Sequence, residues 1–139
     1  MQLEFCPQMS DTKKYPTLVW LDLEMTGLDP DSERIIEIAS AVTSHDLSEV
    51  IEGPNLVIKQ PDEFIDNMDE WNTNQHTKSG LVDSLKVTNV SVEQAEQKTL
   101  EFLSRHTESG RSPLCGNSIS HDRRSVSYTH LTLPTTHCV

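Results

Sequence analysis

The apolar residues of the chain gather in short runs, and the first runs predict strands. Residues 17–25, TLVWLDLEM, are rich in β-branched and large apolar side chains and end at a Thr-Gly pair, which predicts a buried central strand. Residues 34–43, RIIEIASAVT, and residues 55–59, NLVIK, predict two further strands, with a turn at Gly53 and Pro54 before the second. Together the three runs predict an antiparallel meander.

Helical spacing follows. Residues 63–80 are mostly polar, with four large apolar residues at roughly helical spacing, and Gly80 supplies a stop signal. The clearest helix starts at Ser91, because Ser91 and Gln94 form an S-x-x-Q capping box ahead of an apolar stripe, and it should end near Arg105. Residues 113–115 then predict a short strand, after which the chain turns into a helix that carries His121 and Asp122.

The last segment breaks this pattern. In residues 125–139, SVSYTHLTLPTTHCV, Thr and Ser crowd the positions where an apolar helix face should continue, and Pro134 interrupts it. The chain has 139 residues and a mass of 15.7 kDa, which is enough for one domain. We therefore predict a flexible leader at 1–15, one folded domain at 16–124, and an aberrant tail at 125–139 that is not part of the fold.

The charge balance restricts the partners. The chain carries 11 basic and 22 acidic side chains, a formal charge of -11, which disfavours a broadly cationic grip on long nucleic acid or an anionic membrane. An anionic substrate would therefore have to be bound by a local site rather than by a broadly basic surface.

The cysteines and the apolar runs bear on the compartment. Cys6, Cys115 and Cys138 lie far apart and form no C-x-x-C pair, so a reducing compartment is favoured. No apolar stretch approaches the ~18 residues of a membrane span, and residues 1–10 lack the features of a secretory signal. These observations favour the cytoplasm and predict no role in a membrane.

Asp22 and Glu24 stand two residues apart in an otherwise apolar strand. Because successive side chains of a strand point to opposite faces, both carboxylates project to the same side. Two close anions repel, and a divalent cation such as Mg²⁺ or Mn²⁺ binds carboxylates and substrate phosphates together. The pair thus indicates a metal site; the alternative is an exposed polar face on a half-buried strand.

Asp122 is a third candidate ligand, on the helix that follows the short strand. The alternative is a surface ion pair with Arg123 or Arg124, which follow directly in the sequence. Spacing alone does not separate the two interpretations.

Four blocks of sequence carry a resemblance to a known family. They are WLDLEMTGLDP (20–30), RIIEIA (34–39), MDEWNTNQHTKSGL (68–81) and SPLCGNSISHDRR (112–124). In this order they resemble oligoribonuclease, a family of DEDD 3′-to-5′ exonucleases. The resemblance covers about residues 16–124 and identifies that segment as a partial exonuclease domain.

The resemblance implies a ribonuclease-H-like α/β fold: a mixed sheet with antiparallel first three strands, flanked by helices and incomplete at the C-terminus. Asp22 and Glu24 match the first exonuclease motif and Asp122 the second, all three as catalytic ligands of a two-metal site for Mg²⁺ or Mn²⁺.

The resemblance also implies substrate contacts. Leu28 matches a residue that wedges against a terminal base, Trp71 matches an aromatic residue of the binding pocket, and His76 and Ser118 match positions near the substrate. A base stacked on an aromatic face gains ~1–3 kcal/mol whatever its identity. Taken without the family, Leu28 could be a turn packing residue, Trp71 a core helix residue and His76 a solvated surface group.

The implied function is that of a 3′-to-5′ exoribonuclease that degrades short single-stranded RNA to mononucleotides by two-metal-ion hydrolysis. The family's third motif, a general-base histidine and a fourth carboxylate five residues apart, is missing, and no Asp or Glu follows Asp122. We therefore expect a C-terminally truncated chain without catalytic activity. One alternative is a metal-dependent nucleotide- or oligonucleotide-binding module without catalysis, and another is a packing domain with surface charges at Asp22 and Glu24.

Family members form homodimers. Part of their contact surface comes from the segment missing here, so a monomer or an aggregation-prone fragment stays an open alternative. Mitochondria stay open as the compartment of the intact protein.

Overall fold

A four-stranded sheet forms the centre of the computed structural model, which describes residues 17–29 and 31–117. Its strands are β1 (Thr17–Met25), β2 (Ile35–Ser44), β3 (Val50–Val57) and β4 (Leu114–Cys115), in the spatial order β3-β2-β1-β4. The pairs β1–β2 and β2–β3 are antiparallel, whereas β4 runs parallel to β1. The prediction of a mixed sheet with antiparallel first three strands is confirmed.

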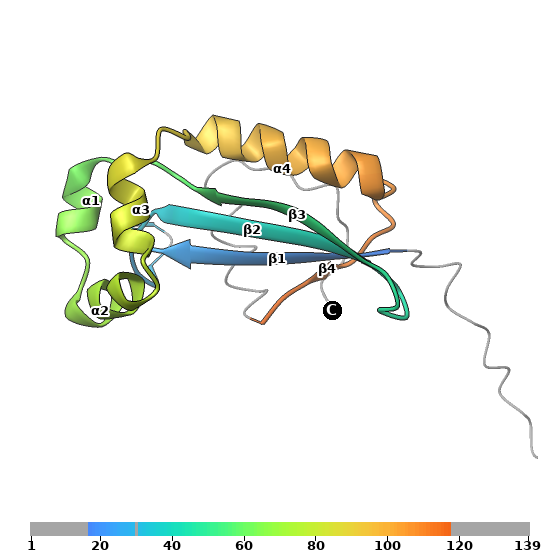
Figure 1. The fold of residues 1–139 in the computed structure, drawn as a ribbon, viewed down its shortest axis with the longest axis horizontal. Coiled ribbons are helices and arrows are strands. Elements are labelled where there is room, and N and C mark those ends of the chain that lie inside the picture. The colour runs from blue at the N-terminus through green and yellow to red at the C-terminus, as the bar shows by residue number, and fades with distance from the viewer. Residues whose placement is uncertain (1–16, 30, 118–139) are drawn as a thin grey trace, which may run out of the picture.

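Helices cover one face and one end of this sheet (Figure 1). The long helix α4 (Val92–His106) lies across one face, and α1 (Asp62–Asp66), α2 (Glu70–Lys78) and α3 (Leu81–Val87) gather at the end where β1 finishes. The predicted start of α4 is confirmed, because Ser91 and Gln94 exchange both hydrogen bonds of the capping box. Within the described residues, none of these helices has the length and apolar character that crossing a membrane requires.

The main core lies between the sheet and α4. Every second residue of β1 points into it, and these side chains meet the buried residues of β2 and of α4. The central members of this core are Val19, Leu21, Leu23, Ile38, Val42, Ala95 and Leu103. A smaller cluster packs α3 against the start of β2, around Ile36, Leu81 and Leu85.

The prediction of a buried strand holds for only one face of β1. Trp20, Asp22 and Glu24 alternate with the core residues and are exposed on the other face within the part of the chain that the structure describes. The alternation of strand side chains explains this separation, since α4 covers only one side of the sheet.

The third strand begins earlier than its apolar run indicates. Gly53 and Pro54, predicted as a turn, lie inside β3 instead, so that prediction is wrong. In the described sheet β3 is an edge strand, where a proline without an N–H group costs no ladder hydrogen bond, and the pairing with β2 shifts register nearby, between Ala39 and Ala41. The chain actually reverses between Ser44 and Glu49, where Leu47 has a φ of 61°.

The helical stretch predicted at 63–80 is two helices, and a third follows it. Asp69 caps a new helix by accepting a hydrogen bond from the backbone N–H of Asn72 at 2.8 Å, so α2 starts there rather than continuing α1. Gly80, with a φ of 79°, follows α2 as predicted, but it also precedes α3, which the apolar spacing did not predict. One continuous helix was therefore the wrong interpretation.

Leu103 tests how the core depends on α4. We expect Leu103→Ala to lower the free energy of unfolding by about 2–5 kcal/mol, because the side chain is 0% exposed and its removal leaves a cavity. Leu100→Ala makes the same chemical change on the half-exposed side of the helix and should cost clearly less. Urea unfolding followed by circular dichroism measures both, and equal losses would contradict the assigned packing.

Candidate metal and nucleotide site

The two carboxylates of β1 lie on the sheet face opposite α4. Asp22 pairs with Ala39 of β2, and Glu24 pairs with Glu37, so the strand register places a third carboxylate across from Glu24. Within the described residues the side chain of Asp22 makes no hydrogen bond or ion pair. This crowding of negative charge, without a described cation beside Asp22, suits a hard divalent ion.

Small side chains next to Asp22 leave this face hollow. A cavity of about 420 Å³ opens there. Among its lining residues are Trp20 and Asp22 of β1, Ala39 and Ala41 of β2, and Gly116 and Asn117, which follow β4. Trp20 borders the hollow in a fixed orientation, because its indole Nε1–H donates to Oγ1 of Thr43 at 3.0 Å. The end of the described chain, at Gly116 and Asn117, therefore borders the same cavity as Asp22.

The surroundings of Glu24 favour its protonated form. Burial raises the pKa of this carboxyl above its usual value, His76 opposes the rise, and the charges of Asp22 and Glu37 add to it. The side chain is still 47% exposed, so solvent screens these interactions. A cation bound between the carboxylates would offset the repulsion that helps to raise the pKa of Glu24, which is consistent with a metal-ligand role for this residue.

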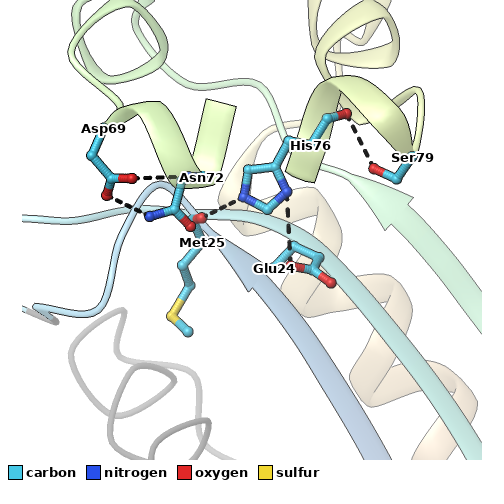
Figure 2. Close-up of polar contacts among 6 residues, drawn as sticks. All are labelled: Glu24, Met25, Asp69, Asn72, His76 and Ser79. Carbon is cyan, nitrogen blue, oxygen red and sulfur yellow. Dashed lines mark hydrogen bonds and ion pairs between the residues drawn. The ribbon is translucent and has the colours of Figure 1, made fainter. Parts of the chain in front are cut away.

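His76 links α2 to the end of β1 (Figure 2). Its Nε2 lies 2.9 Å from the carbonyl oxygen of Met25, and since a carbonyl only accepts, Nε2 carries the hydrogen. The other ring nitrogen, Nδ1, lies 3.9 Å from Oε2 of Glu24, an ion-pair distance when the ring is protonated. The ring is 4% exposed, so the interpretation of His76 as a solvated surface group is wrong.

Helix α2 also determines where Trp71 points. Asn72 and His76 are four residues apart, share one helix face, and are both buried. Asp69 holds Asn72 through two hydrogen bonds, to its backbone N–H and to its side-chain amide, and these bonds lower the pKa of the Asp69 carboxyl. Trp71 points away from this buried face and is 66% exposed, which excludes a role as a core residue.

Leu28 is a second exposed apolar side chain just beyond β1. It lies in the turn between β1 and β2 and is 76% exposed, so it is not a packing residue of that turn. Leu28 and Trp71 thus offer exposed apolar side chains on the turn after β1 and on α2. Side chains of this kind can pack against nucleotide bases.

Two predicted site residues lie outside the described part of the chain. Asp122, the third candidate ligand, and Ser118, a candidate substrate contact, belong to residues 118–139, as does the predicted tail at 125–139; the leader at 1–15 also lies outside. Among residues 17–29 and 31–117 no group of three His, Cys, Asp or Glu side chains is placed to hold a metal ion. Asp22 and Glu24 are oxygen donors of the kind that Mg²⁺ or Mn²⁺ takes, and as a pair they would form part of a ligand set.

The residues that support the site are not predicted from the sequence. Asp69 and Asn72 orient α2, and Glu33 contacts the turn that carries Leu28. Asp69, inside the polar segment 63–80, is a residue type that favours helix N-caps, and this signal could have revealed the first pair. No sequence pattern around Glu33 indicates its contact with Thr26, because that contact depends on how the turn folds back.

Comparison with known proteins extends this description. The sequence model of the family described as Exonuclease matches residues 19–138. The chain is 59% identical to the oligoribonuclease of Bordetella pertussis over 107 residues, which are 77% of this chain and 59% of that protein. It is 52% identical to the oligoribonuclease of Legionella pneumophila over 112 residues, 81% of this chain and 60% of that protein.

The chain spans about 60% of the length of these relatives. Among solved structures, cell-death related nuclease 4 superposes with a TM-score of 0.61 at 18% identity, covering 84% of this chain and 40% of that one. This likeness concerns the fold and confirms the expected ribonuclease-H-like exonuclease architecture. The family match extends beyond residue 124, and the boundary predicted there stays a prediction.

His76 can be tested against Trp71 on the same helix. We expect His76→Ala to lower the free energy of unfolding by about 1–3 kcal/mol, because the carbonyl of Met25 loses its donor in a buried place. Trp71→Ala removes a larger but exposed side chain and should change it by no more than about 0.5 kcal/mol. Thermal and urea unfolding of both variants measure the difference, and the reverse order would contradict the described contacts.

Proposed function

The chain belongs to the exonuclease family, and we propose that it forms part of a 3′-to-5′ exoribonuclease that degrades short single-stranded RNA to mononucleotides. The observation that carries this proposal is the pair Asp22 and Glu24, exposed side by side on β1. Two apolar residues are exposed nearby: Leu28 follows β1 in the chain, and Trp71 belongs to α2, one of the helices at the end where β1 finishes. The names of the similar relatives support RNA of short length as the substrate.

The carboxylates supply the ligands. We propose that Asp22 and Glu24, together with Asp122, hold Mg²⁺ or Mn²⁺, ions that prefer such oxygen donors. When bound, a pair of such ions supplies positive charge next to the scissile phosphate and activates the attacking water. A cation held in this way also lets a chain of charge -11 bind an anionic substrate without a basic groove.

Leu28 and Trp71 supply contacts that do not depend on base identity. Stacking on an aromatic face is worth ~1–3 kcal/mol for any base. His76 is buried and bonded within the protein, so we assign it to positioning Glu24 and Met25 rather than to direct contact with the substrate. Ser118, the next residue in the sequence after Asn117, stays a proposed substrate contact.

A second candidate function is metal-dependent binding of nucleotides or oligonucleotides without turnover. The observation in its favour is that, among the described residues, Asp22 and Glu24 are not joined by a third His, Cys, Asp or Glu placed to hold a metal ion. Incubating the 139-residue polypeptide with a labelled dinucleotide and Mn²⁺ separates the two candidates. Mononucleotide product supports the first, whereas calorimetric binding without product supports the second.

The remaining partners and the compartment follow from the proposed family role. We propose a homodimer for the intact protein and the cytoplasm as its compartment. Analytical ultracentrifugation of the 139-residue polypeptide shows whether these residues suffice for the dimer.

Replacing Asp22 tests the metal site directly. We expect Asp22→Asn to weaken Mn²⁺ binding at neutral pH by about 10-fold or more, because the amide keeps the shape but loses the charge. Asp83→Asn makes the same change on α3, where the carboxylate is exposed and paired with Lys86, and should leave binding unchanged. Titration calorimetry with Mn²⁺ measures both, and equal affinities of the two variants would contradict the assignment.

Trp71 tests the base contact. We expect Trp71→Ala to weaken binding of a dinucleotide about 10-fold, since the loss of one stacked base is worth ~1–3 kcal/mol. Trp71→Phe keeps an aromatic face and should retain most of the affinity. If the phenylalanine variant binds as weakly as the alanine variant, stacking is not the contribution of this residue.

A further inference from the structure

The turn that carries Leu28 is closed by hydrogen bonds at its base. The backbone N–H of Thr26 donates to the carbonyl of Arg34 at 2.9 Å, and the N–H of Arg34 donates to the Thr26 hydroxyl at 2.9 Å. Thr26 is 1% exposed, so this closure is shielded from water. Thr26 and Arg34, the residues on either side of the turn, are therefore held together by this pair of hydrogen bonds.

Glu33 adds a contact that the strand pairing does not require. The Thr26 hydroxyl accepts from Arg34 and donates its own hydrogen to Oε2 of Glu33, so both of its roles are fixed. The same carboxylate lies over Gly27, where an added Cβ would come within 2.7 Å of Cδ of Glu33. Glycine is therefore needed beside Leu28 for the close approach of Glu33.

The outer part of the turn is held as well. The carbonyl of Asp29 accepts from the N–H groups of Ser32 and Glu33 at 3.2 and 2.8 Å. The guanidinium of Arg34 lies 4.4 Å from the ring centroid of Phe64, which ties the end of the turn to α1. Leu28 is the exception, because its side chain remains 76% exposed.

We propose that Glu33 is a positioning residue, whose carboxylate holds the turn through Thr26 and Gly27 so that Leu28 projects toward the base of a bound nucleotide. This inference rests on the proposed nucleotide site. An exposed leucine on a loose turn would have to be ordered when the ligand binds, and that ordering reduces affinity. A turn already fixed by Glu33 avoids the reduction.

The test compares two ligands that differ only in the base. With Mn²⁺ present, titration calorimetry measures the affinity of the 139-residue protein for adenosine 5′-monophosphate and for ribose 5-phosphate. We expect Leu28→Ala and Glu33→Ala each to weaken binding of the nucleotide about 10-fold, and neither to change binding of the sugar phosphate. The double variant should bind no more weakly than either single variant, because Glu33 acts through Leu28.

Two further variants separate positioning from general damage. Glu33→Gln keeps a side-chain oxygen that can accept from Thr26 and should restore most of the affinity for the nucleotide. Glu101→Ala removes another hydrogen-bonded carboxylate, on α4 at the opposite face of the sheet, and should change nothing. Hydrogen exchange should be faster at the amides of Ser32 and Arg34 in Glu33→Ala, and unchanged within α4.

The outcomes distinguish this inference from the proposed function. If Leu28→Ala loses affinity for the nucleotide and Glu33→Ala does not, or if the two losses add, the role of Glu33 is wrong and the nucleotide site stands. Unchanged exchange in the turn of Glu33→Ala also overturns it. If the unaltered protein binds neither ligand with Mn²⁺, the proposed function itself fails.

Discussion

A β-strand sends successive side chains to opposite faces, and in β1 this alternation separates the core residues Val19, Leu21 and Leu23 from Asp22 and Glu24. Because α4 covers only one face, burial of the apolar set fixes the register of the strand. A slip by one residue would place both carboxylates under α4 without partners, at a cost of several kcal/mol. The packing that stabilises the domain thus also decides where its negative charges lie.

The end of β1 is fixed from two sides. His76 reaches from α2 to the carbonyl of Met25 and approaches Glu24, while Glu33 reaches back to Thr26 from the turn just before β2. Two carboxylates and two exposed apolar side chains are therefore displayed by backbone that is itself hydrogen-bonded. A site for a small anionic ligand benefits from such order, since less conformational freedom is lost when the ligand binds.

The sequence predicted the parts of the fold that depend on local signals. The alternation in β1, the Ser91–Gln94 capping box and the short strand at Leu114 were all read correctly, because each is complete within a few residues. The start of β3 and the break between α1 and α2 were missed, since the first depends on an edge position in the sheet and the second on one capping carboxylate. For the site, the shared face of Asp22 and Glu24 followed from spacing, whereas the burial of His76 depends on contact with a residue 51 positions away.

Proline inside β3 has a consequence for the protein in solution. The outer rim of the described sheet presents backbone groups of β3, and such a rim can recruit a strand from another molecule. Pro54 has no N–H group to donate at this edge, and the register shift beside it makes the edge irregular. Both features discourage edge-to-edge pairing of one molecule with the next, although Val50 and Ile51 are exposed close by.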